Sequence, residues 1–125
     1  MSRYVVTGAN RGLGLELVRQ LLAGGERVIA GCRRPGQAQA LNQLAGAYPG
    51  HLHVLPLDAA SERSIVEFAR EAALVAERVD VLINNAGVLV AGERFGTVQA
   101  TALAESFAVN ASAPLLLVQA LAPLL

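Results

Sequence analysis

Three glycines lie within the stretch TGANRGLG, residues 7–14, directly after a short apolar run. Glycine at positions 8, 12 and 14 lets the backbone turn tightly between a strand and a helix, and lets a phosphate approach bare backbone. The first N–H groups of a helix that begins there lack intrahelical partners and would point at that phosphate. The spacing G-x-x-x-G-x-G therefore indicates a phosphate-binding turn, and a purely structural turn is the alternative that the glycines alone leave open.

A second set of candidate residues is basic. Arg33 and Arg34 follow the apolar run Arg27–Cys32, and Arg11 lies between the glycines of the first stretch. At the end of a second strand, a carboxylate would hold a ribose 2′-hydroxyl, whereas a guanidinium would bind a 2′-phosphate through charge-assisted hydrogen bonds. Residues 31–34 contain no carboxylate. The arginines therefore favour NADP(H) over NAD(H), the alternative being that they are solvated surface charges.

Histidine and cysteine are weaker candidates. His51 and His53 are two residues apart in a predicted strand, so they point the same way. The chain has no other histidine and no cysteine near them, so we expect no metal site. Cys32 is the only cysteine, which excludes a disulfide framework and fits a reducing, cytoplasmic setting. No general base is visible beside it, so we expect a small packed residue rather than a nucleophile.

The elements that must position these residues alternate between strands and helices. Apolar runs predict strands at Tyr4–Thr7, Arg27–Cys32, His51–Leu57 and Asp80–Ile83. Helical periodicity predicts helices from Leu13 to the Gly24-Gly25 pair, over Gln37–Leu44, after a Ser61 cap, and from Thr101 to the last residue, with a turn at residues 47–50. This order predicts an α/β fold, a parallel sheet with helices on both faces.

Length and composition limit the possible functions. The 125 residues suit one domain, and a mean hydropathy of +0.45 excludes a disordered chain. Ten arginines balance ten carboxylates, so we expect no nucleic-acid partner. The N-terminal apolar run is too short for a signal peptide, and the apolar stretch Ala113–Leu125 falls short of the ~20 residues of a membrane-spanning helix. We expect a cytoplasmic protein without membrane contact.

Three ordered motifs give the sequence a family resemblance. Thr7–Gly14 matches T-G-x-x-x-G-x-G at every defined position, Asp58 follows the third predicted strand, and N-N-A-G follows the fourth as residues 84–87. Over its whole length the chain resembles the short-chain dehydrogenase/reductase family, and AGCRRPGQAQAL with FAVNASAPLLLVQALAPLL looks most like its carbonyl-reductase and C-factor-like branch. The resemblance implies a Rossmann-type doubly wound sheet, here truncated after about four strands, and an NADP(H)-dependent enzyme acting on small carbonyl or alcohol substrates.

The resemblance also implies which residues bind the cofactor. Asp58 would accept a hydrogen bond from the adenine amino group, or else serve only as a helix-start residue. Residues 85–87 would lie along the ribose on the nicotinamide side, while Asn84 is expected to be mainly structural. The implied cofactor-binding residues are Gly8, Asn10, Arg11, Gly12, Leu13, Gly14, Cys32, Arg33, Arg34, Leu57, Asp58, Asn85, Ala86 and Gly87.

Asn110 is the one candidate for a role in catalysis. It lies in FAVNASAP, within the last predicted helix. Family members have an asparagine here, at a helix distortion that lets its backbone carbonyl hold a water of the proton relay. Many of them have glycine three residues later, where this chain has Ala113 followed by Pro114. Without the resemblance, a buried asparagine hydrogen-bonded to its neighbours is the alternative.

The proton donor that the family uses is missing. Its tyrosine and the lysine four residues later match nothing here, because the only tyrosines are Tyr4 and Tyr48 and the chain has no lysine. We therefore expect residues 1–125 to be the dinucleotide-binding, N-terminal part of a single-domain enzyme, inactive alone. The resemblance also implies that the full-length form is able to form homo-oligomers, because family members commonly pair through helices that include the last one of this sequence. The alternative is a non-catalytic NADP-binding sensor or signalling module.

A chain with only four strands of the sheet is expected to be poorly soluble or loosely folded by itself. The fourth predicted strand would present an open hydrogen-bonding edge, and the last helix would expose leucines. We predict that the isolated 125-residue chain aggregates or folds only loosely, as measured by sedimentation and by thermal unfolding. A soluble monomer with a sharp, reversible unfolding transition would contradict this expectation.

Overall fold

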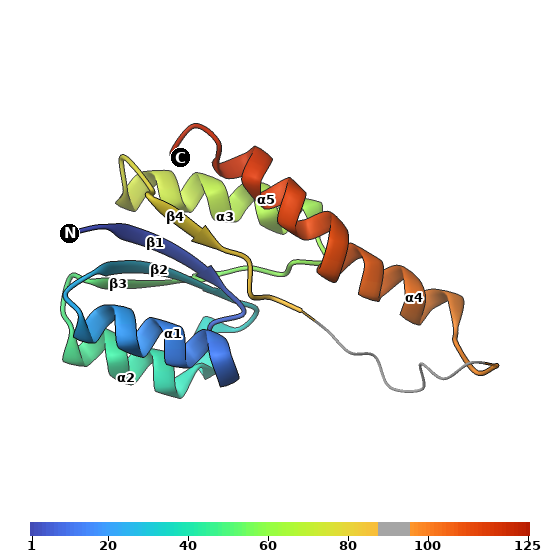
Figure 1. Cartoon of the computed structure of the whole chain (residues 1–125), viewed down its shortest axis with the longest axis horizontal. Coiled ribbons are helices and arrows are strands. Elements are labelled where there is room, and N and C mark those ends of the chain that lie inside the picture. The colour runs from blue at the N-terminus through green and yellow to red at the C-terminus, as the bar shows by residue number, and fades with distance from the viewer. Residues whose placement is uncertain (88–95) are drawn as a thin grey trace.

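The structure, a computed structural model, describes residues 1–87 and 96–125. Within them four parallel strands alternate with helices (Figure 1). The strands are β1 Arg3–Thr7, β2 Arg27–Cys32, β3 Leu52–Pro56 and β4 Val81–Ile83. The α-helices are α1 Gly12–Ala23, α2 Gln39–Ala47, α3 Glu62–Val75, α4 Ala100–Phe107 and α5 Ala113–Leu121, with a 3₁₀ turn at Pro35–Gln37 and a π-helical segment at Ala108–Ser112.

The strand order is β3-β2-β1-β4, so strands that follow β1 in the sequence lie on both sides of it in the sheet. The chain adds β2 and then β3 on one side of β1, and places β4 on the other side. Val5 of β1 is in register with Ile29 of β2 and Leu82 of β4. In an open parallel sheet, such an arrangement separates the loops that follow the two neighbouring strands and leaves a crevice at their carboxyl ends. The expected site residues follow these strands.

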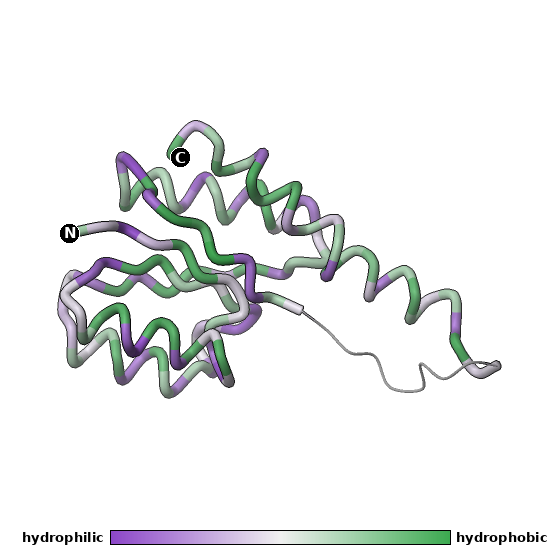
Figure 2. The backbone as a smooth tube through the Cα atoms, viewed as in Figure 1, coloured by the Kyte–Doolittle hydropathy of each residue, from purple (hydrophilic) through white to green (hydrophobic). Residues whose placement is uncertain are grey.

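Helices cover both faces of the sheet, which confirms the predicted fold class. Figure 1 shows α1 and α2 on one face and α3 and α5 on the other. Neighbouring residues of β1 point to opposite cores: Val6 packs in one cluster with Val18 and Leu41, and Val5 packs in the other with Phe68. The alternation of Val5 and Val6 is the two-residue period of a strand buried on both faces. Figure 2 shows hydrophobic residues along β4 and α5, with hydrophilic residues recurring on α1 and α3.

Most of the predicted element ends are confirmed to within one residue. Helix α1 ends at Ala23, Gly25 has a φ of +85°, and the Ser61 hydroxyl accepts a hydrogen bond from the Ser64 N–H at 3.1 Å. The second predicted helix is placed wrongly at both ends. A 3₁₀ turn with proline at its first position precedes α2, which begins at Gln39 and includes residue 47, assigned to a turn from the sequence.

The last helix is also different from its prediction. It ends at Leu121 rather than at the last residue, because the chain then turns back and the Leu124 carbonyl accepts a hydrogen bond from the Val79 N–H at 2.8 Å. Between α4 and α5, the π-helical segment Ala108–Ser112 inserts a wider turn around Asn110. The helix distortion that the family resemblance implied at this residue is therefore confirmed.

Helices α4 and α5 form one continuous run with the π-helical segment. This run, Ala100–Leu121, is 22 residues long with a mean hydropathy of 1.4, so by length and composition alone it could cross a membrane. The core helix of a soluble protein passes the same test. Ala113–Leu125 alone is shorter than a membrane-spanning helix, but the joined helix is not, so the absence of membrane contact stays a prediction.

The outer edge of β4 is open within residues 1–87 and 96–125, because no strand described there pairs with it. Leu103, Phe107 and Leu115 are each at least 60% exposed, so the expected exposure of leucines on the last helix is confirmed. Figure 1 shows α4 projecting beyond the end of the sheet. Both features are apolar or hydrogen-bonding surfaces that further protein would be able to cover.

Gly31 provides a test of how tightly the sheet and α3 pack. A Cβ at this position would lie 2.9 Å from Leu57 Cδ2 and 3.1 Å from Phe68 Cε2. In the protein at its full natural length, we predict that Gly31→Ala lowers the free energy of unfolding in urea by about 1–3 kcal/mol, because the added methyl group overpacks the core. The matched control is Gly46→Ala in α2, where a Cβ meets nothing within 4 Å. It is expected to stabilise by about 0.5–1 kcal/mol, and equal effects of the two substitutions would contradict the prediction.

Candidate functional site

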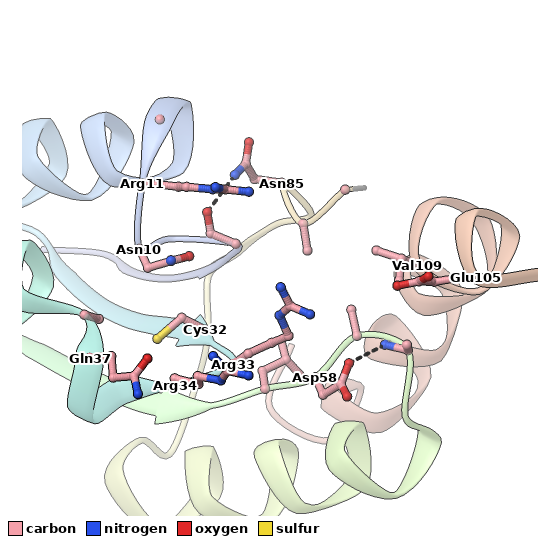
Figure 3. A pocket seen from close by; sticks show the side chains of 18 residues that line it. Asn10, Arg11, Cys32, Arg33, Arg34, Gln37, Asp58, Asn85, Glu105 and Val109 are labelled. Carbon is pink, nitrogen blue, oxygen red and sulfur yellow. Dashed lines mark hydrogen bonds between the residues drawn. The ribbon is translucent and has the colours of Figure 1, made fainter. Parts of the chain in front are cut away.

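A cavity of about 700 Å³ opens at the carboxyl ends of the strands, where the strand order reverses. Figure 3 shows side chains facing it from the β1–α1 turn, the end of β2, the β3–α3 turn, the segment after β4 and α4. Its described lining residues are Gly8, Asn10, Arg11, Gly12, Cys32, Arg33, Arg34, Gln37, Ala38, Leu57, Asp58, Ala59, Ala60, Asn85, Ala86, Gly87, Glu105 and Val109.

Glycine is required for different reasons at the three positions of the β1–α1 turn. Gly8 and Gly12 have φ values of +61° and +58°, which residues with a side chain rarely adopt. A Cβ on Gly12 would meet nothing within 4 Å, so its requirement is conformational. Gly14 is buried, and a Cβ there would lie 2.3 Å from the Gly8 carbonyl oxygen. Gly14 therefore keeps α1 close to the turn and does not line the cavity.

The start of α1 offers an anion unpaired N–H groups. Arg11 occupies the N-cap position with an extended backbone, no side chain caps the helix, and its first turn contains no acidic residue. The N–H groups at the start of an α-helix have no intrahelical acceptor, and the helix dipole favours an anion there. Leu13 lies in this first turn and is 68% exposed. Its side chain is apolar, so its backbone N–H is the group that can bind an anion.

Thr7 and Asn85 tie the end of β1 to the segment after β4. The buried Thr7 hydroxyl oxygen accepts hydrogen bonds from the N–H groups of Asn85 at 3.1 Å and Ala86 at 3.0 Å. The Asn85 carboxamide donates to the Gly8 carbonyl oxygen at 3.1 Å. Asn84 is exposed, so the structural link expected of Asn84 is made by Asn85 instead. Sequence reasoning assigned Thr7 no role beyond its place in the motif.

Three arginines face the cavity from two elements. Arg11 extends from the start of α1, while Arg33 and Arg34 follow β2, with Gln37 next to them in the 3₁₀ turn (Figure 3). Within the described residues, the ion pairs involve other arginines, namely Arg19–Glu16, Arg63–Glu67 and Arg78–Asp80. The guanidinium groups at the cavity are therefore available to an anionic ligand.

Cys32 lies at the end of β2 and is buried, as expected of a small packed residue. Burial raises the pKa of its thiol, an effect that a hydrogen bond with the Arg34 backbone partly opposes. A raised pKa disfavours the reactive thiolate. Cys32 therefore contributes shape rather than nucleophilic chemistry to the cavity wall, and Leu57, also buried, continues this wall.

Asp58 has both a local role and a place in the cavity. Its Oδ1 accepts a hydrogen bond from the Ala60 N–H at 3.0 Å, and its own N–H donates to the Ser64 hydroxyl at 2.8 Å. These bonds fix the turn that leads into α3, so the helix-start role is present. The side chain is exposed at the cavity, and its second carboxylate oxygen remains able to accept from a ligand.

Gly87 lines the cavity and lies close to Asn110. A Cβ on Gly87 would lie 3.3 Å from the Asn110 Oδ1, so the absence of a side chain at Gly87 makes room for this carboxamide. Asn110 is exposed rather than buried in the π-helical segment, and it does not line the cavity itself. The expected burial of this asparagine is therefore wrong, although Asn110 does interact with its surroundings.

The structure brings together twelve of the fourteen expected cofactor residues as cavity lining; only Leu13 and Gly14 do not line it. Sequence reasoning missed lining residues that carry no motif, namely Gln37, Ala38, Ala59, Ala60, Glu105 and Val109. The first four follow closely on recognised residues, so proximity in the chain was an available signal. Glu105 and Val109 had none, because they reach the cavity only through the packing of the helices.

The family is shown by comparison with known proteins. The model of the short chain dehydrogenase family matches residues 3–125, so the chain belongs to this family. The short-chain dehydrogenase fogG of Aspergillus ruber is 41% identical over 124 residues, which cover 96% of this chain and 35% of that protein. Mouse retinol dehydrogenase 14 is 46% identical over 96 residues, covering 67% of this chain and 29% of that protein.

Solved structures with the same fold include one with bound NADPH and one with bound NADP. An NADPH-bound carbonyl reductase from chicken fatty liver superposes with a TM-score of 0.90 at 37% identity, covering 99% of this chain and 51% of that one. A metagenomic short-chain oxidoreductase in complex with NADP superposes with a TM-score of 0.87 at 34% identity, covering 98% and 55%. The chain thus spans about half the length of these proteins.

The hydroxyl of Thr7 provides a test of the link between β1 and β4. Thr7→Val keeps the shape of the side chain but removes the acceptor, which leaves the Ala86 N–H without a partner. In the protein at its full natural length, we predict a loss of about 1–3 kcal/mol in the free energy of unfolding, together with weaker nucleotide binding, because residues 85–87 line the cavity. Thr7→Ser retains the hydroxyl and is the control. Equal stability and affinity in the two variants would contradict the role of the hydroxyl.

Proposed function

We propose that this chain forms the NADP(H) site of an oxidoreductase that transfers hydride between the nicotinamide ring and a carbonyl or alcohol substrate. The observation that carries the proposal is the basic end of the cavity: Arg33 and Arg34 follow β2, no carboxylate stands with them, and Arg11 faces them from α1. A carboxylate there would repel a 2′-phosphate. The NADPH and NADP held by the two solved relatives support the same choice.

Each part of the cavity suits one part of this cofactor. The glycine turn and the first N–H groups of α1 bind the pyrophosphate, and the arginines bind the 2′-phosphate. Asp58 accepts from the adenine amino group beside Leu57. Residues 85–87 lie along the ribose on the nicotinamide side, where the narrow Gly87 leaves the backbone accessible. When bound, the nicotinamide supplies or accepts the hydride.

Proton transfer needs residues beyond those in the cavity. Tyr4 lies on β1 and Tyr48 follows α2, both packed against the core cluster on the α1–α2 face, and the chain contains no lysine. Asn110, at the π-helical segment, would hold a relay water with its backbone carbonyl. We propose that residues 1–125 are the N-terminal part of a single-domain enzyme, and that they supply the cofactor site but not the proton donor, so that this stretch alone is inactive.

The missing tyrosine and lysine also favour a second candidate, a dinucleotide-binding sensor without catalysis. The two functions differ in what the protein does at its full natural length. An enzyme would oxidise NADPH when simple aldehydes and ketones are added, whereas a sensor would bind NADPH without consuming it. Spectrophotometric measurement of NADPH in the presence of a carbonyl panel distinguishes them.

Arg33→Asp tests the cofactor assignment. The substitution removes a charge-assisted hydrogen bond to the 2′-phosphate and adds a carboxylate that repels it and can hold a 2′-hydroxyl instead. We predict that the ratio of NADP(H) to NAD(H) affinity falls by roughly 30-fold or more, measured by titrating the protein with both cofactors.

The matched control is Arg27→Asp at the other end of β2. Arg27 is exposed and does not line the cavity, so its substitution makes the same change of charge without approaching the ligand. Its effect on the affinity ratio is expected to be small, because exposed charges far apart are screened by salt. An unchanged ratio in Arg33→Asp, or an equal change in both variants, would overturn the NADP(H) assignment.

A further inference from the structure

Glu105 faces the cavity from α4, and none of the roles assigned above uses it. Val109, four residues later, lines the same cavity. Val109 belongs to the π-helical segment that continues α4, so this part of the molecule presents a carboxylate and an apolar side chain to the cavity together. Figure 3 shows both side chains across the cavity from Arg33, Arg34 and Gln37.

The charged residues around the cavity must face different parts of a ligand. Its described charged lining residues are Arg11, Arg33, Arg34, Asp58 and Glu105. The arginines suit phosphate oxygens, which carboxylates repel. Asp58 and Glu105 must therefore face a part of the ligand that is neutral or donates hydrogen bonds.

Glu105 is not already committed to a basic partner in the described part of the chain. The ion pairs found there are formed by Glu16, Glu67 and Asp80. Asp58, in contrast, already accepts a hydrogen bond from the Ala60 N–H at its Oδ1. Of the two carboxylates at the cavity, Glu105 is therefore able to accept more hydrogen bonds from a ligand.

We propose that Glu105 accepts a hydrogen bond from the exocyclic amino group of the adenine ring, and that it thereby selects a 6-amino purine over a 6-keto purine. This inference rests on the proposed NADP(H) site. An amino group donates two hydrogens, so Asp58 and Glu105, on different elements, can each accept one. Val109 packs against the apolar face of the ring. A keto oxygen in the same place would meet carboxylate oxygens and be repelled.

The test compares NADPH with its hypoxanthine analogue, in which a keto oxygen replaces the 6-amino group. Dissociation constants for both are measured with the protein at its full natural length, by the change in NADPH fluorescence or by calorimetry. A Glu105→Gln carboxamide can accept from the amino group and can also donate to the keto oxygen. We expect this variant to reduce the preference for NADPH about fivefold, chiefly through tighter binding of the analogue.

Glu77→Gln is the matched control, because Glu77 is exposed between α3 and β4 and does not line the cavity. It removes the same charge and should leave the preference unchanged. If Glu105→Gln alters both affinities by the same factor, or alters neither, the inference is overturned while the NADP(H) site stands. If the unsubstituted protein binds neither compound, the proposed function fails and this inference fails with it.

Discussion

The carboxyl ends of β1 and β4 are held together by one buried hydroxyl and one carboxamide, and the cavity depends on that junction. Thr7 accepts from two backbone N–H groups after β4, and Asn85 donates to the Gly8 carbonyl. Because a Cβ on Gly8 would lie 2.9 Å from the Ala86 Cα, the two segments cannot approach this closely with any larger residue. The start of α1 and the segment 85–87 are thereby placed on two sides of one opening.

Charge is distributed around this opening in a way that the neutral net charge of the chain conceals. Arginines gather at the β2 end, and carboxylates approach from α4 and from the β3–α3 turn. The described ion pairs lie elsewhere on the surface, where they contribute little to stability. The membership of the short-chain dehydrogenase family and the proposed NADP(H) site are consistent with this separation, because the cofactor carries phosphates at one place and a hydrogen-bond donor at another.

The helical run α4–α5 contributes both to the hydrophobic core and to the wall of the cavity. Its C-terminal half packs on α3 and completes the core with Leu117 and Leu121. Its N-terminal half projects beyond the sheet and brings Glu105 and Val109 to the cavity. The π-helical segment between them allows Asn110 to meet Gly87 without breaking the helix.

Features that depend on neighbours in the chain could be predicted from the amino-acid sequence. Apolar runs located the four strands, the Ser61 cap and the Gly24-Gly25 pair bounded helices, and the glycine spacing marked the turn, because these patterns act over one or two turns of backbone. Features that depend on the register between distant segments became visible only in the folded structure. Thr7 meets Asn85 across 78 residues, Gly14 is confined by the turn it follows, and Glu105 reaches the cavity only after α5 docks on α3. No local pattern encodes such contacts, since they follow from which strands pair and which faces pack.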